Sequence, residues 1–210
     1  VIERPANVVK ELVENSIDAS SSKIDIIIEE GGMNLIQIID DGSGMDKDDA
    51  RLCFSRHATS KIYNDQDLFC IQTLGFRGEA IPSVASISHF VLKTSDWSQG
   101  STVIYEFGKF IEQKQSDLNR GTNISVSKLF QNVPARLKYV KSVNAEFAHI
   151  QNYVERLSLS HPDIAFTLIH NDKMTYKTNG NGNLLEVIHQ IYGLSVVKNM
   201  LNLKAGNDEF

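Results

Sequence analysis

Apolar and polar residues recur along the chain with two different periods, which predict where helices and strands lie. After Pro5, a residue suited to a first helical turn, apolar residues return every three or four positions and predict a helix over Pro5–Ala19. The other predicted helices begin near Asp46, cover Glu79–Ala85, run from a cap at Asn144 to a point before Pro162, and extend from Leu184 to about Tyr192.

Segments rich in isoleucine and other β-formers predict the strands. Lys23–Glu30 and Leu35–Ile39 flank Gly31-Gly32, which predicts a β-hairpin. The other predicted strands are His89–Thr94, Ser101–Phe107, Phe110–Gln115, Thr122–Leu129, Ile164–His170 and Met174–Thr178. We expect the strands between His89 and Leu129 to form an antiparallel meander. Residues 55–79 show no sustained period, and a loop longer than about 12–15 residues is typical of a lid or a binding segment.

The segment Thr178–Asn183 is rich in Asn and Gly and predicts a linker. We therefore expect one domain over residues 1–182, followed over residues 183–210 by a linker and the beginning of a second domain. A length of 210 residues suits one large domain or one domain plus a fragment. Because the chain opens at Val1 without an initiator Met and stops at Phe210 without a closing element, we expect a fragment cut at both ends.

Composition and charge narrow the class of protein. Hydrophobic residues make up 41% and charged residues 22%, which excludes a disordered tail, a collagen-like repeat and a coiled coil. The formal net charge is −5, so any contact with nucleic acid must be local. No apolar run approaches the roughly 18 residues that span a bilayer, and no export signal precedes the first helix. These features and the two cysteines, Cys53 and Cys70, predict a cytoplasmic protein with ordinary buried thiols.

Three polar residues of the first predicted helix lie on one face of it. Glu11, Asn15 and Asp18 stand at positions i, i+4 and i+7. Such a stripe is often a solvated helix face. The alternative is chemical, because a carboxylate can polarise a water molecule and an amide oxygen can ligate Mg²⁺.

A glycine-rich turn follows the second predicted strand. In Asp40-Asp41-Gly42-Ser43-Gly44-Met45, an acidic residue at a strand end precedes two glycines that let a planar ligand approach the backbone. A plain tight turn explains the segment equally well. It is not a dinucleotide fingerprint, because Lys47 stands where the third glycine belongs, and the chain has no Walker A sequence.

Further polar segments follow in the chain. Gly75–Ala80 opens a predicted helix, where glycine N–H groups, the helix dipole and Arg77 suit phosphate oxygens; the alternative is a flexible surface loop. Arg120-Gly121-Thr122 either completes a polar pocket or forms a plain hairpin turn.

A basic segment without acidic residues spans 120–141 and predicts either a solvated face or weak, salt-sensitive, non-specific DNA binding. Its basic residues are Arg120, Lys128, Arg136, Lys138 and Lys141.

Together, motifs in five segments closely resemble the MutL family of DNA mismatch repair proteins, within the gyrase, Hsp90, histidine kinase and MutL (GHKL) superfamily. The segments are Lys10–Ala19, Asp40 with Gly42 and Gly44, His57–Ile62, Gly75–Ala80, and Asn132–Tyr139. The resemblance covers essentially the whole chain. Gly75–Ala80 is the signature that distinguishes MutL from histidine kinases and Hsp90-like chaperones, which share the pocket.

The resemblance implies roles for individual residues. Glu11 would be the general base and Asn15 the Mg²⁺ ligand. Asp40 would accept the adenine amino group, Gly44 would let the base lie against the backbone, and Thr122 would support the same pocket. The other implied nucleotide contacts are Asp18, Ala19, Gly42 and Met45, together with an ATP lid that contains Thr59, Ser60, Lys61, Gly75, Phe76, Arg77 and Gly78.

The implied fold is α/β, a Bergerat-type two-layer sandwich with a mixed, mainly antiparallel sheet and helices on one face, plus the start of a ribosomal S5-like second domain. The implied function is a slow, Mg²⁺-dependent ATPase switch. ATP would order the lid and drive homodimerisation, and mismatch-recognition and downstream repair proteins would respond to that state in the cytoplasm, at the nucleoid during repair. The alternative is a nucleotide-gated interaction module without useful turnover.

The chain also departs from the family pattern. Asp41 stands where the family usually has Asn, which adds a negative charge near the expected nucleotide. The strand and loop that usually precede Val1 are absent from the sequence, and the second domain is present only from about Leu184. We expect these two absences to affect hydrolysis more than nucleotide binding.

Overall fold

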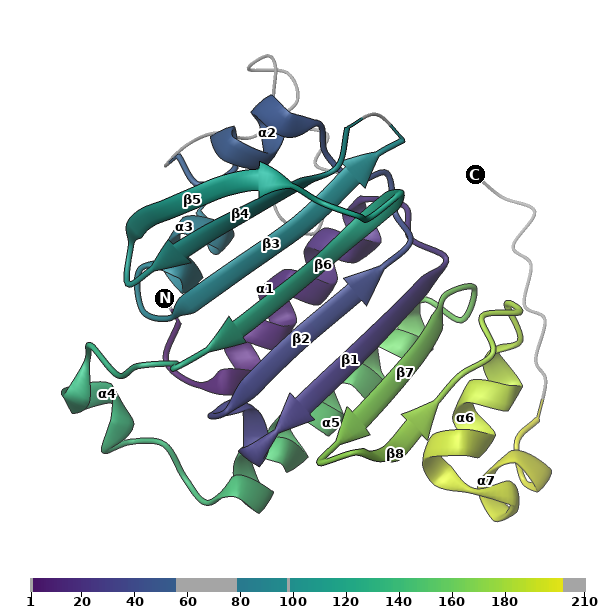
Figure 1. The fold of residues 1–210 in the computed structure, drawn as a ribbon. Coiled ribbons are helices and arrows are strands. Elements are labelled where there is room, and N and C mark those ends of the chain that lie inside the picture. Colours follow the sequence, from purple (N-terminus) through teal and green to yellow (C-terminus); the bar gives the residue numbers. More distant parts are fainter. Residues whose placement is uncertain (1, 56–78, 98, 202–210) are drawn as a thin grey trace, which may run out of the picture.

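The computed structural model describes residues 2–55, 79–97 and 99–201. These residues form a sheet with helices packed on one of its faces (Figure 1). The strands are β1 (Lys23–Glu29), β2 (Leu35–Asp40), β3 (His89–Asp96), β4 (Ser101–Glu106), β5 (Lys109–Gln115), β6 (Arg120–Ser127), β7 (Ala165–His170) and β8 (Lys173–Lys177). The helices are α1 (Pro5–Asp18), α2 (Lys47–Leu52), α3 (Ala80–Ala85), α4 (Pro134–Leu137), α5 (Val143–Ser160), α6 (Leu184–Tyr192) and α7 (Leu194–Lys198), with a 3-10 turn η1 (Glu30–Gly32) between β1 and β2.

The sheet has eight strands in the order β5-β4-β3-β6-β2-β1-β7-β8. Neighbouring strands are antiparallel except for β1 and β7, which run parallel. In the part of the chain that the structure describes, the opposite face of the sheet carries no helix (Figure 1). The predicted mixed, mainly antiparallel α/β sandwich is therefore confirmed.

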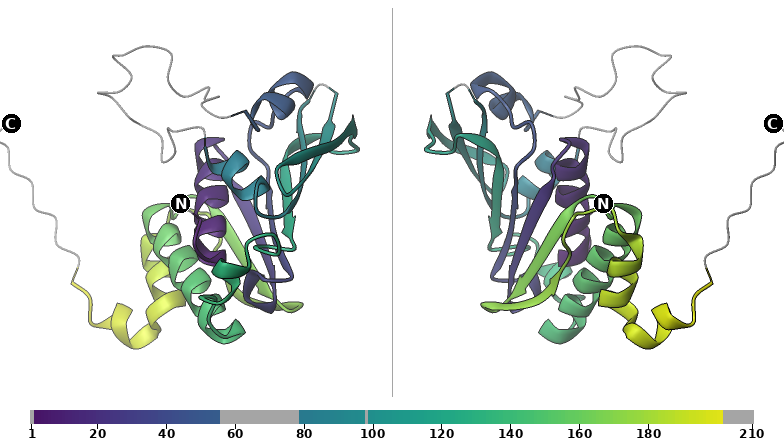
Figure 2. Two further views of the ribbon diagram at one scale, coloured as in Figure 1. Left: turned by 90° about the vertical axis from the view of Figure 1, so that its left-hand side faces the viewer. Right: turned by 90° about the vertical axis from the view of Figure 1, so that its right-hand side faces the viewer.

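The core lies between the sheet and the pair α1 and α5, which contact each other on the same side of the sheet (Figure 2). The predicted α1 helix buries Val8, Val9, Leu12 and Val13. Every second residue of β1 and β2 is also buried, including Ile26, so both strands turn one apolar face towards the helices. Burying an aliphatic side chain of this size contributes about 1.5–3 kcal/mol.

The predicted meander is wrong at its last strand. β3, β4 and β5 do follow one another, but β6 returns to the middle of the sheet and pairs with both β3 and β2. The side chains explain the order, because β6 buries Ile124 and Val126 while most residues of β5 are exposed. A polar strand is tolerated at a sheet edge, whereas an apolar strand gains from neighbours on both sides.

Helix boundaries differ from prediction at one cap. α5 begins at Val143, and the Oγ atom of Ser142 accepts the N–H of Ala145, so Asn144 lies inside the helix and does not cap it. Both residue types are good N-caps, and the extended backbone of Ser142 decides between them. The short helices α4 and α7 and the turn η1 were not predicted. None of the helices in the described part of the chain is long and apolar enough to cross a membrane.

Candidate functional site

Adjacent strands present three polar residues at one end of the sheet. Asp40 ends β2, Thr122 lies opposite it on β6, and Thr94 lies opposite Thr122 on β3. All three are buried. Because directly opposed residues of neighbouring strands share a face, the three side chains line one polar strip on the helix side of the sheet.

Asp40 is held by hydrogen bonds from two segments. The Oγ atom of Ser16 on α1 donates to Asp40 Oδ2 at 2.7 Å, and the N–H of Gly42 donates to Oδ1 at 3.0 Å. Burial raises the pKa of Asp40, and hydrogen bonds from Ser16, Gly42 and Ser21 offset part of the effect. A carboxylate offers about four lone-pair sites, so both oxygens can still accept a donor from a ligand.

The turn after Asp40 leaves no room for side chains at its glycines. Gly44 has a φ of +67°, and a Cβ atom there would lie 1.8 Å from the carbonyl oxygen of Ser95. A Cβ atom at Gly42 would lie 2.6 Å from the Oγ atom of Ser21 and 2.9 Å from Cβ of Ala19. Glycine is therefore required at both positions, because the backbone of the turn packs directly against Ser95, Ser21 and Ala19.

The turn is anchored to its surroundings at three points. The N–H of Ser43 donates to the carbonyl of Ala19 at 2.9 Å, next to the end of α1. The N–H of Met45 donates to Thr94 Oγ1 at 2.9 Å, and Thr94 Oγ1 lies 3.2 Å from Thr122 Oγ1. At the third point, Arg120 Nε donates to the carbonyl oxygen of Gly42 at 3.1 Å. The structure thus brings Ala19, the turn and Thr122 close together.

Asp41, the unusual second acidic residue, is exposed and bound elsewhere. Its carboxylate accepts the N–H groups of Ser22 at 2.8 Å and Lys23 at 2.9 Å, and the hydroxyl of Ser22 at 2.5 Å. Burial alone would raise the pKa of Asp41, but these hydrogen bonds outweigh it and hold the pKa below its usual value. The additional carboxylate therefore fixes the start of β1.

The predicted polar stripe lies on the continuous helix α1. Glu11, Asn15 and Asp18 are half-buried, and the rise of a helix separates Glu11 from Asn15 by about 6 Å along the axis. Burial and the nearby carboxylates of Glu14 and Glu11 raise the pKa of Tyr153 on α5. The hydroxyl of Tyr153 donates to Glu14 Oε1 at 2.5 Å, which fixes this end of α1 against α5.

Other predicted site residues lie outside the described part of the chain. These are the lid residues Thr59, Ser60, Lys61, Gly75, Phe76, Arg77 and Gly78. Cys70 also lies outside it. Cys53 is half-buried, and burial raises the pKa of its thiol to about 12, so the thiol is protonated at neutral pH.

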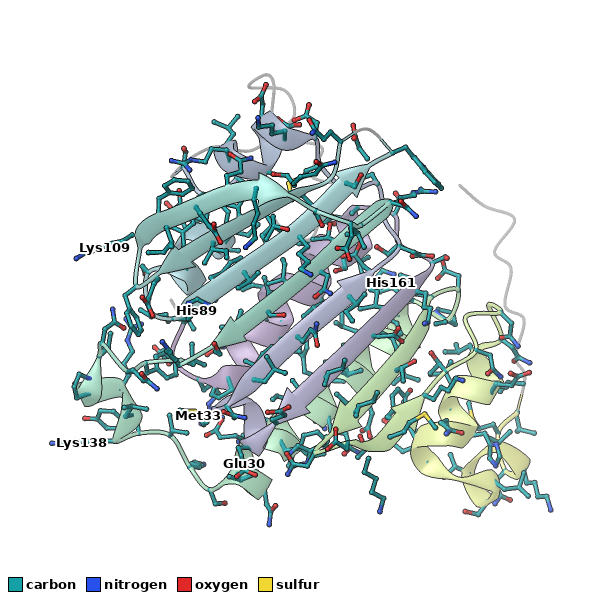
Figure 3. All side chains as sticks on the ribbon, in the orientation of Figure 1. Glu30, Met33, His89, Lys109, Lys138 and His161 are labelled. Carbon is teal, nitrogen blue, oxygen red and sulfur yellow. The ribbon has the colours of Figure 1, made fainter. Side chains whose placement is uncertain are left out.

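The structure does not bring the five basic residues of 120–141 into one surface. Arg120 and Lys128 lie at and just beyond opposite ends of β6, and Lys128 Nζ pairs with Glu106 at 2.9 Å. Arg136 Nη1 donates to the carbonyl of Ile2 at 3.0 Å. Lys138 and Lys141 are exposed, and Lys138 points away from the sheet (Figure 3).

A cavity of about 160 Å³ lies away from Asp40, beside α6. It is lined by residues 177–181 and by Glu186, Val187, His189 and Gln190. Asn181 and Asn183 each donate to the Glu186 carboxylate at 2.9 Å, so the acidic group there is already paired. Among the residues that the structure describes, no group of three or more His, Cys, Asp or Glu side chains could hold a metal ion.

Sequence reasoning missed Ser16, Ser21 and Thr94, and it gave the Arg120 side chain no role beyond the basic segment and a turn that could complete a polar pocket. Ser16 stands one residue after Asn15 in the helix motif, and its bond to Asp40 depends on how α1 packs on β2. The sequence alone does not mark Thr94 as a site residue. Its place beside Thr122 becomes clear only when the pairing of β3 with β6 is known.

Comparison with known proteins shows the family to which the chain belongs. The family model described as "Histidine kinase-, DNA gyrase B-, and HSP90-like ATPase" matches residues 3–138. The DNA mismatch repair protein MutL of Listeria innocua is 54% identical over the whole chain, and that of Halalkalibacterium halodurans is 50% identical. The chain spans 35% and 33% of the lengths of these relatives.

Solved structures show the same fold. The Aquifex aeolicus MutL ATPase domain complexed with ADP matches with a TM-score of 0.72 and 27% identity, over 91% of this chain and 70% of that one. The N-terminal domain of a DNA repair protein matches with a TM-score of 0.78 and 28% identity, over 92% of this chain and 58% of that one. The chain belongs to the family of histidine kinase-, DNA gyrase B- and HSP90-like ATPases, and the relatives that are 50–54% identical to it over its whole length are MutL proteins.

Proposed function

We propose that the chain is the ATP-binding and slowly ATP-hydrolysing domain of a MutL-type DNA mismatch repair protein. The observation that carries the proposal is the buried carboxylate of Asp40, which Ser16 and Gly42 orient beside the glycine-rich turn that follows it. A similar domain, the Aquifex aeolicus MutL ATPase domain, has been solved in complex with ADP, which supports nucleotide binding by this fold.

Adenine recognition follows from the acceptors at the strand ends. Asp40 accepts the exocyclic amino group of the base, and the flat face of the base lies against the backbone of Gly42 and Gly44. Thr122, together with Thr94, supplies hydroxyl groups beside the carboxylate. Guanine presents a carbonyl oxygen where adenine has the amino group, so an ionised Asp40 favours adenine. Asp18, Ala19 and Met45 complete the nucleotide contacts.

The residues of α1 suit hydrolysis assisted by Mg²⁺. Mg²⁺ in phosphate sites usually has one or two protein ligands and takes the rest from phosphates and water, so the side-chain oxygen of Asn15 suffices as a protein ligand. The bound ion neutralises charge that develops on the phosphates. Glu11, one turn away, removes the proton from the attacking water, a role that contributes about 10²–10⁴-fold to the rate.

The wider switch is also part of the proposal. The lid residues Thr59, Ser60 and Lys61, with Gly75–Gly78, cover the ribose and phosphates when ATP binds. Lid ordering then drives homodimerisation and recruitment of mismatch-recognition and downstream repair proteins. Residues 1–182 act as the ATPase domain and residues 183–210 lead into the second domain. Lys138 and Lys141 provide a weak, non-specific DNA contact.

Calorimetric titration with a non-hydrolysable ATP analogue and Mg²⁺ tests the proposal. Asp40→Asn places an N–H donor near the adenine amino group, and we expect the affinity to fall at least about tenfold. Asp41→Asn is the matched control, since it removes the same charge one residue away and we expect an effect below about twofold. An affinity unchanged by Asp40→Asn would reject the site. Normal binding of the analogue, together with no hydrolysis of ATP in a separate assay, would instead favour a nucleotide-gated interaction module.

A further inference from the structure

Arg120 lies against the turn that follows Asp40, although its charge suggested a DNA contact. Its Nε atom donates to the carbonyl oxygen of Gly42 at 3.1 Å. The guanidinium also lies 5.9 Å from the ring centre of Trp97, the only tryptophan of the chain. The side chain therefore rests between the β3–β4 turn and the turn after Asp40.

The backbone around Arg120 explains how the side chain reaches Gly42. The next residue, Gly121, has a φ of +88°, and a Cβ atom there would lie 2.2 Å from the carbonyl oxygen of Asp40. The start of β6 thus runs directly beside the end of β2, in the register that places Thr122 opposite Asp40. From this position the Arg120 side chain spans the strand end and contacts the turn.

Gly42 connects Arg120 to the carboxylate that binds adenine in the proposed function. The carbonyl of Gly42 accepts from Arg120, and the N–H of the same residue donates to Asp40 Oδ1 at 3.0 Å. A hydrogen bond from a charged donor is worth more than a neutral one, and it restricts the rotation of the peptide that follows Gly42. The peptide that carries the Gly42 N–H shares the Gly42 Cα atom with it, so loss of the Arg120 bond would leave Gly42, and with it the N–H that donates to Asp40, less restrained.

We propose that Arg120 is a positioning residue for adenine recognition, which holds Gly42 so that Asp40 faces the amino group of the base. The proposal rests on the proposed function of the site. It predicts a selective loss: the contact between Asp40 and the amino group depends on Arg120 more than the rest of the nucleotide does. It also separates Arg120 from Lys138 and Lys141, which face solvent.

The test compares two nucleotides that differ only at that amino group. The β,γ-imido analogues of ATP and of purine riboside triphosphate are titrated calorimetrically with Mg²⁺ into the parental chain, Arg120→Gln and Lys109→Gln. Lys109→Gln is the matched control, because it removes one positive charge from exposed β5. Thermal unfolding of each variant verifies that it is folded.

We expect Arg120→Gln to lower the affinity for the ATP analogue about fivefold to tenfold and to change that for the purine riboside analogue less than about twofold. Lys109→Gln should change neither. Equal losses for both nucleotides, or no loss for the ATP analogue, would overturn the proposal for Arg120 while leaving the proposed function intact. A parental chain that binds neither nucleotide would reject the proposed function itself, and the role of Arg120 with it.

Discussion

The turn after Asp40 and the basic segment 120–141 both stood out in the sequence, but the structure treats them differently. Around the turn, Ser16 of α1 donates to the Asp40 carboxylate, Thr94 of β3 accepts the N–H of Met45, and Arg120 of β6 donates to the carbonyl of Gly42. In the basic segment, Arg120, Lys128 and Arg136 each bind a different part of the fold. Basic residues that are close in the sequence therefore need not lie on one surface of the fold. A polar residue at a buried strand end is instead held in one position by the elements packed around it.

The largest expected effect is on the rate of ATP hydrolysis and not on nucleotide affinity, and it comes from α1, the helix that packs against the turn. Glu11→Ala should lower the rate of ATP hydrolysis by about 10²–10⁴-fold, because the attacking water loses its base, while the affinity for an ATP analogue stays within about twofold. Hydrolysis is measured under single-turnover conditions. Glu112→Ala, on the exposed edge strand β5, is the control and should keep the parental rate. Parental turnover in Glu11→Ala would remove that residue from its role.

The next effect measures how closely the turn is packed. Gly44→Ala should lower the free energy of unfolding by about 3 kcal/mol, because the new Cβ atom meets the Ser95 carbonyl in a left-handed backbone. Gly182→Ala has a similar φ of +77° with open space around it, so it should cost only about 1 kcal/mol. Both are measured by urea denaturation. Equal costs at the two glycines would show that the turn is not tightly packed.

A smaller effect concerns the hydroxyl that holds the carboxylate. Ser16→Ala removes the 2.7 Å hydrogen bond to Asp40 and should lower the free energy of unfolding by about 1–2 kcal/mol. The pKa of Asp40, already raised by burial, should rise further because the hydrogen bond favours the charged form. Ser22→Ala, at an exposed serine that binds Asp41, is the control and should cost less. An unchanged stability and pH profile in Ser16→Ala would contradict the role of this contact.

The raised pKa of Asp40 also predicts how folding stability and nucleotide affinity change with pH. The folded chain binds this proton more tightly than the unfolded chain, so the group favours folding below its unfolded pKa, and that contribution is lost as pH rises through the folded pKa. Nucleotide binding has the opposite dependence, because the ionised form accepts the amino group. The affinity ratio of parental chain to Asp40→Asn should therefore decrease as pH falls through the folded pKa. A ratio independent of pH would be inconsistent with an ionised acceptor.

The smallest expected effects concern DNA binding by the lysines of the basic segment 120–141. Lys138→Gln and Lys141→Gln should each weaken DNA binding a few-fold at low salt and lower the salt dependence by about one counterion, because both side chains face solvent. Lys128→Gln, paired with Glu106, should change DNA binding less. Fluorescence anisotropy of labelled duplex DNA measures each. Equal effects at all three lysines would restore the predicted single patch.

Sequence periodicity predicted what depends on neighbours in the chain. The helix α1 and the β1–β2 hairpin carry strong local patterns, and both form where expected. The place of β6 in the sheet could not be predicted, because its pairing with β2 depends on how much apolar surface β6 buries compared with the other strands. The contact between Ser16 and Asp40 likewise depends on how a helix packs on a strand, which no local spacing encodes.

A crystal structure of the chain with a non-hydrolysable ATP analogue and Mg²⁺ tests adenine recognition by Asp40 most directly. The adenine amino nitrogen should lie about 2.7–3.2 Å from an oxygen of the Asp40 carboxylate, with the base against Gly42 and Gly44. The Ser16 and Gly42 bonds to that carboxylate should be retained. A nucleotide bound elsewhere, or a base whose amino group faces away from Asp40, would contradict the site.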